Sequence, residues 1–173
     1  MTQSDTPIDV LIMMGSDSDW PAMSACHELL DELNISHEVM VASAHRTPAK
    51  VHQVAASVGP RGVKVLICAA GMAAHLAGSV AALVDVPVVG VPMPGGMMDG
   101  LDALLSTVQM PPGVPVATVG VGKAGAKNAA VLTAQIMSLS DADLAKRLRV
   151  WRNDQAKGVE AKNLKLQDTL KSS

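Results

Sequence analysis

Short apolar runs alternate along this chain with longer segments of helical periodicity, and this alternation constrains the fold more than any other feature. The runs are rich in Val and Ile, which is typical of parallel strands covered by helices on both faces. The expected strands are Val10–Met14, Glu38–Val41, Val63–Ala69, Val88–Val91 and Val116–Val119. The expected helices are Trp20–Leu33, Pro48–Val58, Ala73–Leu83, Gly100–Val108, Ala124–Leu139 and Asp141–Gln155. The pattern predicts an α/β fold with a central parallel sheet.

A chain of 173 residues is most simply one domain. We expect that domain to occupy residues 1–156, because no linker or internal repeat interrupts them. Residues 157–173 are polar and charge-rich, with a few scattered apolar side chains. We expect this tail either to dock as a helix on a neighbouring subunit or to fray.

Composition excludes several classes of function. The formal net charge is −2 without a basic block, and two Trp are the only aromatic residues, so we expect no nucleic-acid partner. Cys26 and Cys68 form no CxxC pair, and the polar N-terminus does not resemble a signal peptide. These features predict a protein of the reducing cytoplasm.

One segment, residues 65–84, is 20 residues long and carries no formal charge, which is enough to span a bilayer. Gly71, His75 and Gly78 interrupt it, and its first half has the pattern of a buried strand. We therefore expect no membrane span.

The strongest chemical signal is Ser43-Ala44-His45-Arg46-Thr47-Pro48, between an expected strand and an expected helix. Ligands of open α/β sheets bind where strands end. The guanidinium of Arg46 matches a phosphate, and the imidazole of His45 exchanges a proton near neutral pH. The motif indicates an enzyme that acts on a phosphorylated small molecule.

A second signal follows the first expected strand, at Gly15-Ser16-Asp17-Ser18-Asp19. Backbone N–H groups at such a helix start form an anion cradle. We expect Ser18 to be a helix cap, whereas Ser16 lies further from the helix and is less easily explained by capping. Since Asp19 would repel a phosphate, we expect it to bind sugar hydroxyls if it binds the ligand.

His75 follows the third expected strand, in a run of small residues. From the sequence it is either a hydrogen-bonded interior histidine or a pocket residue. No His/Cys/Asp cluster has metal-ligand spacing, and neither a P-loop nor a dinucleotide fingerprint occurs, so we expect no metal and no cofactor.

Two uncharged loops, residues 92–98 and 109–115, are rich in Pro, Gly and Met. Their apolar content suits subunit contacts or pocket lining better than free solvent. The chain is 49% hydrophobic overall, and together with these loops this composition predicts a homo-oligomer.

Five ordered motifs together resemble one family. They are Met14-Gly15-Ser16-Asp17-Ser18-Asp19-Trp20, Ser43-Ala44-His45-Arg46-Thr47-Pro48, Ala73-Ala74-His75-Leu76, Ser106-Thr107-Val108-Gln109-Met110-Pro111 and Gly122-Lys123-Ala124-Gly125-Ala126-Lys127-Asn128-Ala129-Ala130. The chain is similar to the N5-carboxyaminoimidazole ribonucleotide mutases of purine (IMP) biosynthesis over roughly residues 10–151. The resemblance implies a flavodoxin-like three-layer α/β/α sandwich and an octamer with active sites at subunit contacts.

The resemblance also implies the reaction and its residues. A carboxylate moves from the exocyclic N5 nitrogen to ring carbon C4 of 5-aminoimidazole ribonucleotide, without metal or cofactor. By matching position, His45 moves protons. The residues implied to bind substrate are Ser16, Ser43 and Arg46 for the phosphate, Asp19 for the ribose, and Gly71, Ala73, His75 and Leu76 for the base and carboxylate.

The match is incomplete around the third strand end, where Ala69, Met72 and Ala77 replace the family's usual Gly, Gly and Pro. We expect these side chains to affect the pocket wall. Two alternatives stay open. A related branch carboxylates aminoimidazole ribonucleotide directly with CO2 and usually has Lys at the position of Arg46, so the arginine favours the mutase. A non-catalytic sensor of phosphorylated ligands would need the anion loops but not His45.

Overall fold

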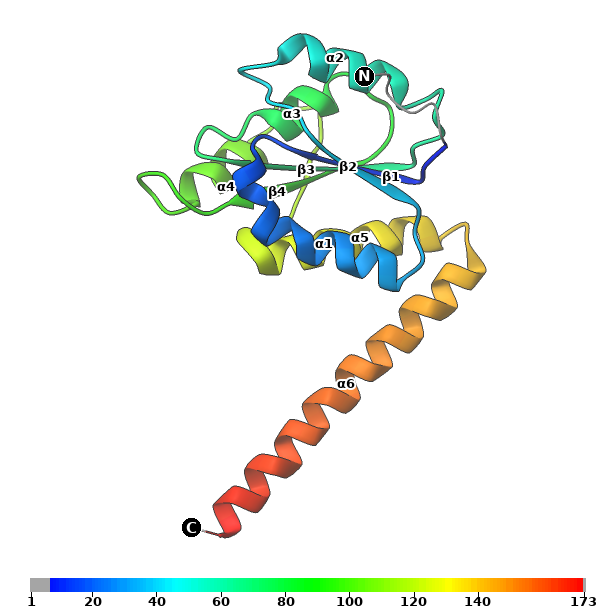
Figure 1. The fold of residues 1–173 in the computed structure, drawn as a ribbon, viewed down its shortest axis with the longest axis vertical. Coiled ribbons are helices and arrows are strands. Elements are labelled where there is room, and N and C mark those ends of the chain that lie inside the picture. Colours follow the sequence, from blue (N-terminus) through cyan, green and yellow to red (C-terminus); the bar gives the residue numbers. More distant parts are fainter. Residues whose placement is uncertain (1–6, 173) are drawn as a thin grey trace. The chain divides into compact units, whose positions relative to one another are not determined.

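A computed structural model describes residues 7–172 and contains a sheet of five parallel strands (Figure 1). The strands are β1 (Val10–Met14), β2 (His37–Val41), β3 (Val65–Gly71), β4 (Val88–Met93) and β5 (Ala117–Thr118). Their order is β2-β1-β3-β4-β5, the doubly wound order of flavodoxin-like folds. The predicted α/β sandwich with a parallel sheet is therefore confirmed.

The helices alternate with the strands, as the hydrophobic pattern predicted. They are the short 3-10 helix η1 (Asp17–Asp19), then α1 (Trp20–Glu32), α2 (Pro48–Ser57), α3 (Leu76–Ala81), α4 (Leu101–Val108), α5 (Gly122–Ser138) and α6 (Ala142–Lys171). In Figure 1, α2 and α3 cover one face of the sheet, while α1 and the part of α5 before residue 134 lie on the other.

The core is built from the strands at the centre of the sheet. All five residues of β1 are buried, and β3 pairs with it in register from Val10↔Val65 to Met14↔Ala69. Leu11 and Met13 of β1 join an apolar cluster with side chains of α2 and α3. The edge strand β2 is only half-buried. Burial on both faces explains the continuous apolar runs of the central strands.

Several elements differ from expectation at their ends. The third strand continues to Gly71, and Met72 has a left-handed φ of +53°, so α3 begins at Leu76 rather than Ala73. For a residue other than glycine, a positive φ lies outside the strand and right-handed helix regions, so the strand ends before Met72. The last strand has two residues instead of the expected four.

Cys26 and Cys68 are free and buried, as expected for a chain without a disulfide scaffold. Burial raises the pKa of both thiols to about 12. Neither cysteine is suited to nucleophilic chemistry, because the reactive form is the thiolate.

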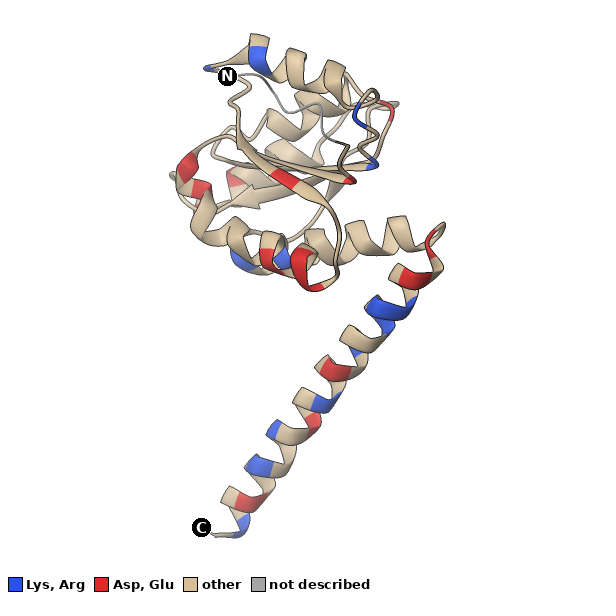
Figure 2. Ribbon diagram, turned by 45° about the vertical axis from the view of Figure 1, so that its right-hand side comes forward, with Lys and Arg blue, Asp and Glu red and all other residues tan. Residues whose placement is uncertain are grey.

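The chain divides into two compact units after Thr133. In the second unit, α6 continues through the polar tail to Lys171 and includes Gly158. Asp141 caps its start by accepting bonds from the N–H groups of Asp143 and Leu144. Figure 2 shows acidic and basic residues interleaved along this helix. The expected domain boundary after residue 156 stays a prediction. Among the described residues, no helix is long and apolar enough to cross a membrane.

Candidate active site

A cleft of about 510 Å³ opens where the loops after β1, β2, β3 and β4 meet. It is lined by Gly15, Ser16, Ser18, Asp19, Ser43, Ala44, His45, Arg46, Ala70, Gly71, Met72, Ala73, His75, Leu76, Pro94, Gly95 and Gly96. All nine residues that the sequence nominated are in this set. The carboxyl ends of parallel strands meet at one edge of the sheet, which explains how residues 60 positions apart come together.

The loop after β1 is held by its own side chains. The Ser16 hydroxyl accepts a bond from the Ser18 N–H at 3.3 Å, and the Asp19 carboxylate accepts one from the Ser16 N–H at 3.1 Å. These bonds form a capping box on η1. The expected helix cap at Ser18 is therefore wrong: Ser16 caps η1, which begins directly after it, and the N-cap of α1 is Asp19.

Asp19 lies half-buried between this loop and Arg46. Desolvation by burial is the largest influence on its carboxyl group and raises its pKa, and the nearby charge of Asp17 acts in the same direction. The hydrogen bond from the Ser16 backbone and the charge of Arg46 lower it, but the net shift is upward. A polar ligand that donates hydrogen bonds would stabilise the ionised form.

Arg46 connects the loops after β1 and β2. Its Nη2 donates to the carbonyl oxygen of Gly15 at 2.8 Å, and its Nε lies 3.5 Å from the Ser43 hydroxyl. The loop itself is fixed because the Ser43 N–H donates to the Thr47 hydroxyl at 2.9 Å. Two anchoring contacts leave the remaining N–H groups of the guanidinium to bind an anion.

His45 and His75 form a direct pair across the cleft. The Nε2 of His45 lies 2.8 Å from the Nδ1 of His75, and the rings meet edge to face, with centroids 4.9 Å apart. One of these two nitrogens carries a proton that the other accepts, so the pair holds one proton between two titratable rings. His75 is exposed, which rules out the interior role that the sequence had left open.

Sequence reasoning missed this pairing. The two histidines follow β2 and β3, which lie on either side of β1 in the sheet. Both side chains can reach over the end of β1, but only the strand order reveals that. With the order unknown, spacing along the chain carries no signal of the contact.

The loop after β4 completes the cleft with Pro94, Gly95 and Gly96. Of the two roles expected for the loop of residues 92–98, subunit contact or pocket lining, Pro94, Gly95 and Gly96 have the second. A Cβ on Gly96 would come within 3.0 Å of the Met72 side chain, and the φ of Gly96 is +71°. Met72 therefore lies against a glycine of the facing loop and contributes to the cleft wall as expected, whereas Ala69 and Ala77 are buried and are not among the lining residues.

Comparison with known proteins identifies the family of this chain. The family model described as AIR carboxylase matches residues 9–158. The chain belongs to this family. It is 48% identical to the N5-carboxyaminoimidazole ribonucleotide mutase of Escherichia coli K12 over 92% of this chain and 94% of the relative. It is 47% identical to that of Mycobacterium tuberculosis over 96% and 95%.

Solved structures agree with this assignment. PurE of Treponema denticola superposes with a TM-score of 0.82 at 29% identity, covering 91% of this chain and 97% of that one. The AIR carboxylase family match spans the whole cleft, since every residue that lines it lies between positions 9 and 158.

One cluster lies outside the cleft. His27, Asp31 and His37 place their ligand atoms within 4.8 Å of one another. Spacing along the sequence showed no metal-ligand cluster, but the fold brings these three potential ligands together. Spacing alone could show only that His27 and Asp31 share a helix face, because β2 brings His37 to them from outside α1.

Proposed function

We propose that this protein converts N5-carboxyaminoimidazole ribonucleotide to 4-carboxy-5-aminoimidazole ribonucleotide in purine biosynthesis. The observation that carries the proposal is the His45–His75 pair beside Arg46, in a cleft of a chain whose relatives are named for this reaction. A proton-sharing pair next to an anion site is what an intramolecular carboxylate transfer on a phosphorylated substrate needs.

The substrate's phosphate binds at the end of β1. Arg46, Ser16 and Ser43 supply the guanidinium and two hydroxyls. The Asp19 carboxylate accepts hydrogen bonds from the ribose hydroxyls. The base then extends toward the histidine pair, along the wall made by Gly71, Ala73 and Leu76.

His45 acts twice in the reaction. Its imidazolium first protonates the exocyclic nitrogen as the N–C bond breaks, which releases CO2 and neutral aminoimidazole. Ring carbon C4 then attacks CO2, and the neutral imidazole removes the C4 proton to restore aromaticity. Protons balance over the cycle, because the one donated in the first step is recovered in the last. The hydrogen bond to His75 orients the His45 ring throughout.

The finer assignment is a cytoplasmic homo-octamer that needs no cofactor. An exposed apolar face supports association into an oligomer: Leu101, Leu105 and Val108 lie at helical spacing on α4, and Met97 in the turn before it is 99% exposed. Apolar faces of this kind usually mark contacts between subunits. Sedimentation or light scattering measures the assembly, and a monomeric mass at micromolar concentration would contradict it.

Product absorbance tests the proposed reaction. The purified chain, given the N5-carboxylated substrate in bicarbonate-free buffer, is expected to form the 4-carboxy product, and the His45→Asn variant is not. Turnover that appears only with aminoimidazole ribonucleotide and added bicarbonate would instead assign the direct carboxylase. Ribonucleotide binding without either turnover would assign a sensor.

A further inference from the structure

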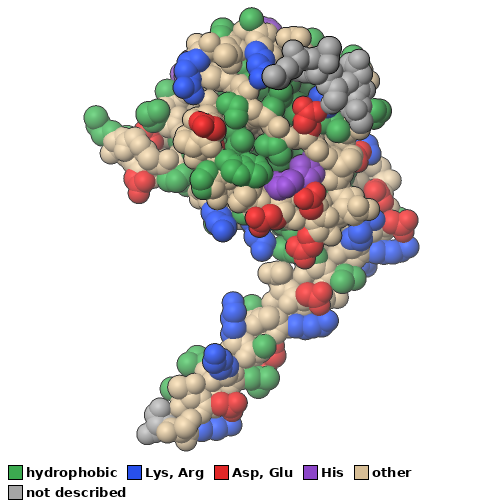
Figure 3. Space-filling model, in the orientation of Figure 1, with side chains coloured by type: hydrophobic (Ala, Val, Ile, Leu, Met, Phe, Trp, Pro, Cys, Tyr) green, Lys and Arg blue, Asp and Glu red, His purple; other side chains and the backbone are tan. Residues whose placement is uncertain are grey.

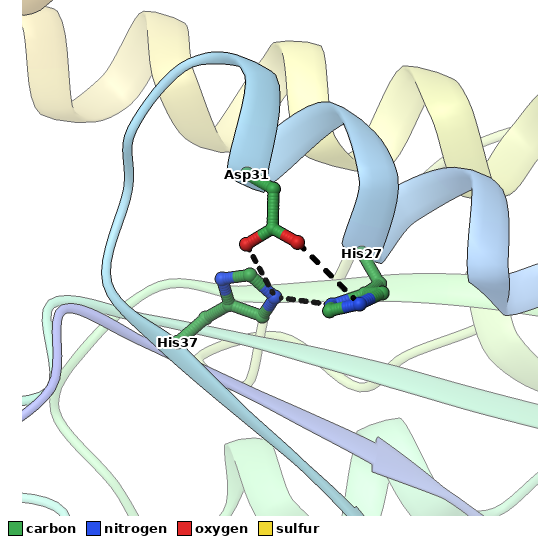
Figure 4. A group of neighbouring side chains, drawn as sticks. All are labelled: His27, Asp31 and His37. Atoms are coloured by element: carbon green, nitrogen blue, oxygen red, sulfur yellow. Dashed lines mark hydrogen bonds and ion pairs between the residues drawn. The ribbon is translucent and has the colours of Figure 1, made fainter.

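A second group of titratable side chains lies on the opposite side of the sheet from α2 and α3, away from the cleft. His27 and Asp31 are one turn apart on α1, and His37 is the first residue of β2. Figure 4 shows the two rings and the carboxylate pointing toward one another. None of the three lines the cleft.

The three side chains are close enough to share one ion. The Nδ1 of His27 lies 2.7 Å from the Nε2 of His37. The Asp31 oxygens lie 3.5 Å from the Nε2 of His27 and 3.9 Å from the Nε2 of His37. Taking one ligand atom from each residue, all lie within 4.8 Å of one another.

His37 is oriented as a metal ligand usually is. Its Nδ1 lies 2.8 Å from the carbonyl oxygen of Ile35 and donates to it, which leaves the lone pair on Nε2 facing His27 and Asp31. Its side chain is 5% exposed, so packing also holds the ring. Metal-bound histidines almost always donate their other ring N–H to a carbonyl or carboxylate in this way.

We propose that His27, Asp31 and His37 bind a divalent transition-metal ion of the zinc type. Two imidazole nitrogens and one carboxylate oxygen are common protein ligands of Zn²⁺, and imidazole also suits Cu²⁺ and Ni²⁺. Water completes the coordination, because Asp31 is 61% exposed and His27 is 37% exposed. Figure 3 shows histidine side chains with acidic side chains beside them on this face of the molecule. The exposure of Asp31 and His27 lets an ion enter from solvent.

Binding requires a small adjustment. The 2.7 Å contact between the two rings is a hydrogen bond, whereas two nitrogens on a tetrahedral zinc ion lie about 3.3 Å apart for bonds of about 2.0–2.1 Å. His37 is fixed by Ile35, so the partly exposed His27 ring is the one that moves. The ion replaces the proton that the two rings share.

Calorimetric titration of the full-length protein with ZnCl2 tests this site. We expect one ion per chain, and a loss of at least about 100-fold in affinity in His27→Gln and in His37→Gln, since even outer partners of ligands often account for about 10–100-fold. His52→Gln, at an exposed histidine of α2, is the matched control and leaves the affinity unchanged. Wild-type affinity in His27→Gln, or no zinc binding by the wild type, overturns the proposal.

Trp20 provides a second measurement that locates the ion. Its ring centroid is 5.6 Å from that of His27, and Trp151→Phe leaves it as the sole Trp of the chain. Cu²⁺ is expected to quench its fluorescence with saturation at one equivalent, and Zn²⁺ to compete. Quenching that survives His27→Gln but disappears in His75→Gln would place the ion in the cleft and overturn the proposal.

An Asp31 variant and the pH dependence of binding test whether the carboxylate and the imidazole rings are the ligands. Asp31→Asn keeps the shape but removes the charge, so it weakens Zn²⁺ binding, whereas a site made of the two rings alone would be unaffected. Wild-type affinity is also expected to be lower at pH 5 than at pH 7.5, because zinc binds the neutral imidazole and protons compete for its nitrogens. An affinity that is the same at pH 5 and pH 7.5 contradicts binding by histidine.

Discussion

Two pairs of histidines in this molecule have nearly the same geometry and different surroundings. His45 and His75 approach to 2.8 Å in the cleft, and His27 and His37 approach to 2.7 Å between α1 and β2. The first pair lies beside a guanidinium and two serine hydroxyls in a concave site. The second has a carboxylate and a backbone carbonyl as neighbours. The same contact therefore supports two different chemistries, and the neighbours decide which.

Proton transfer needs rings that can change their charge easily, and a nearby anion site holds the substrate against them. Metal binding needs a ring whose other nitrogen is already committed to a carbonyl, with a negative ligand at the third position. Substitutions that separate the two pairs can break or sharpen this contrast.

The largest effect is expected from His45→Asn. Asparagine keeps a hydrogen bond but cannot carry a proton, so turnover should fall by at least about 100-fold, since acid–base groups usually contribute about 10²–10⁴-fold to the rate. Ribonucleotide binding should stay nearly normal. Steady-state kinetics and calorimetry measure the two quantities. His27→Asn is the control from the other pair and should retain full turnover. If His45→Asn kept more than a tenth of the activity, His75 would become the proton carrier.

Arg46→Ala should weaken ribonucleotide binding by more than about tenfold, since hydrogen bonds to charged groups contribute about 1.5–3 kcal/mol each. Arg46→Lys should recover only part of the affinity, because an ammonium cannot form the paired contacts of a guanidinium. Calorimetric titration of each variant with the ribonucleotide measures both affinities. An unchanged dissociation constant in Arg46→Ala would remove this residue from the site.

His75→Asn should lower turnover less than His45→Asn does, by roughly tenfold or below, if His75 orients the proton carrier rather than acting as one. The pH profile of turnover separates the two roles, because loss of the partner ring shifts the profile while the reaction continues. A loss as large as that of His45→Asn, with an unshifted profile, would instead give both rings equal parts.

The smallest effect is expected from Asp19→Asn, on the free energy of unfolding of the ligand-free protein. Because burial raises the folded pKa of Asp19 above its unfolded value, folding favours the protonated form, and this group's contribution to stability decreases as pH rises through the window just above its ordinary pKa. At pH 7 the neutral amide should therefore be at least as stable as wild type in urea unfolding, yet bind ribonucleotide more weakly. Reduced stability together with full affinity would contradict the assignment of Asp19 to the ribose.

The sequence predicted the gathering of the site residues because one rule suffices for it: strand ends of a parallel sheet converge at one edge. That rule brought together Ser16, Arg46 and His75 from three separate loops. It could not predict contacts that depend on the lateral order of strands, such as the His45–His75 pair, or on the approach of a helix to an edge strand, such as His27 to His37. The cap at Ser16 was missed for a local reason, since η1 is too short to show a periodicity.

The tail shows a similar limit. The few apolar residues over 157–171 left open whether the tail forms a helix or frays, but good helix formers such as Leu and Lys dominate there, and α6 continues to Lys171. Propensity rather than burial is the signal that this segment offered.

Gly158 gives this long helix a point of weakness. At 1.5 Å per residue α6 rises about 45 Å, and a glycine in a helix interior costs about 1 kcal/mol relative to alanine. The 13 residues from Val159 to Lys171 are by themselves at the length where a helix in water is only marginally stable, about 12–15 residues. Backbone amides beyond Gly158 should consequently exchange with solvent deuterium much faster than those before it. A subunit that packs against Val159, Leu166 and Leu170 would remove this difference in exchange rate. The exchange rate of residues 159–171 therefore reports assembly without any change to the catalytic cleft.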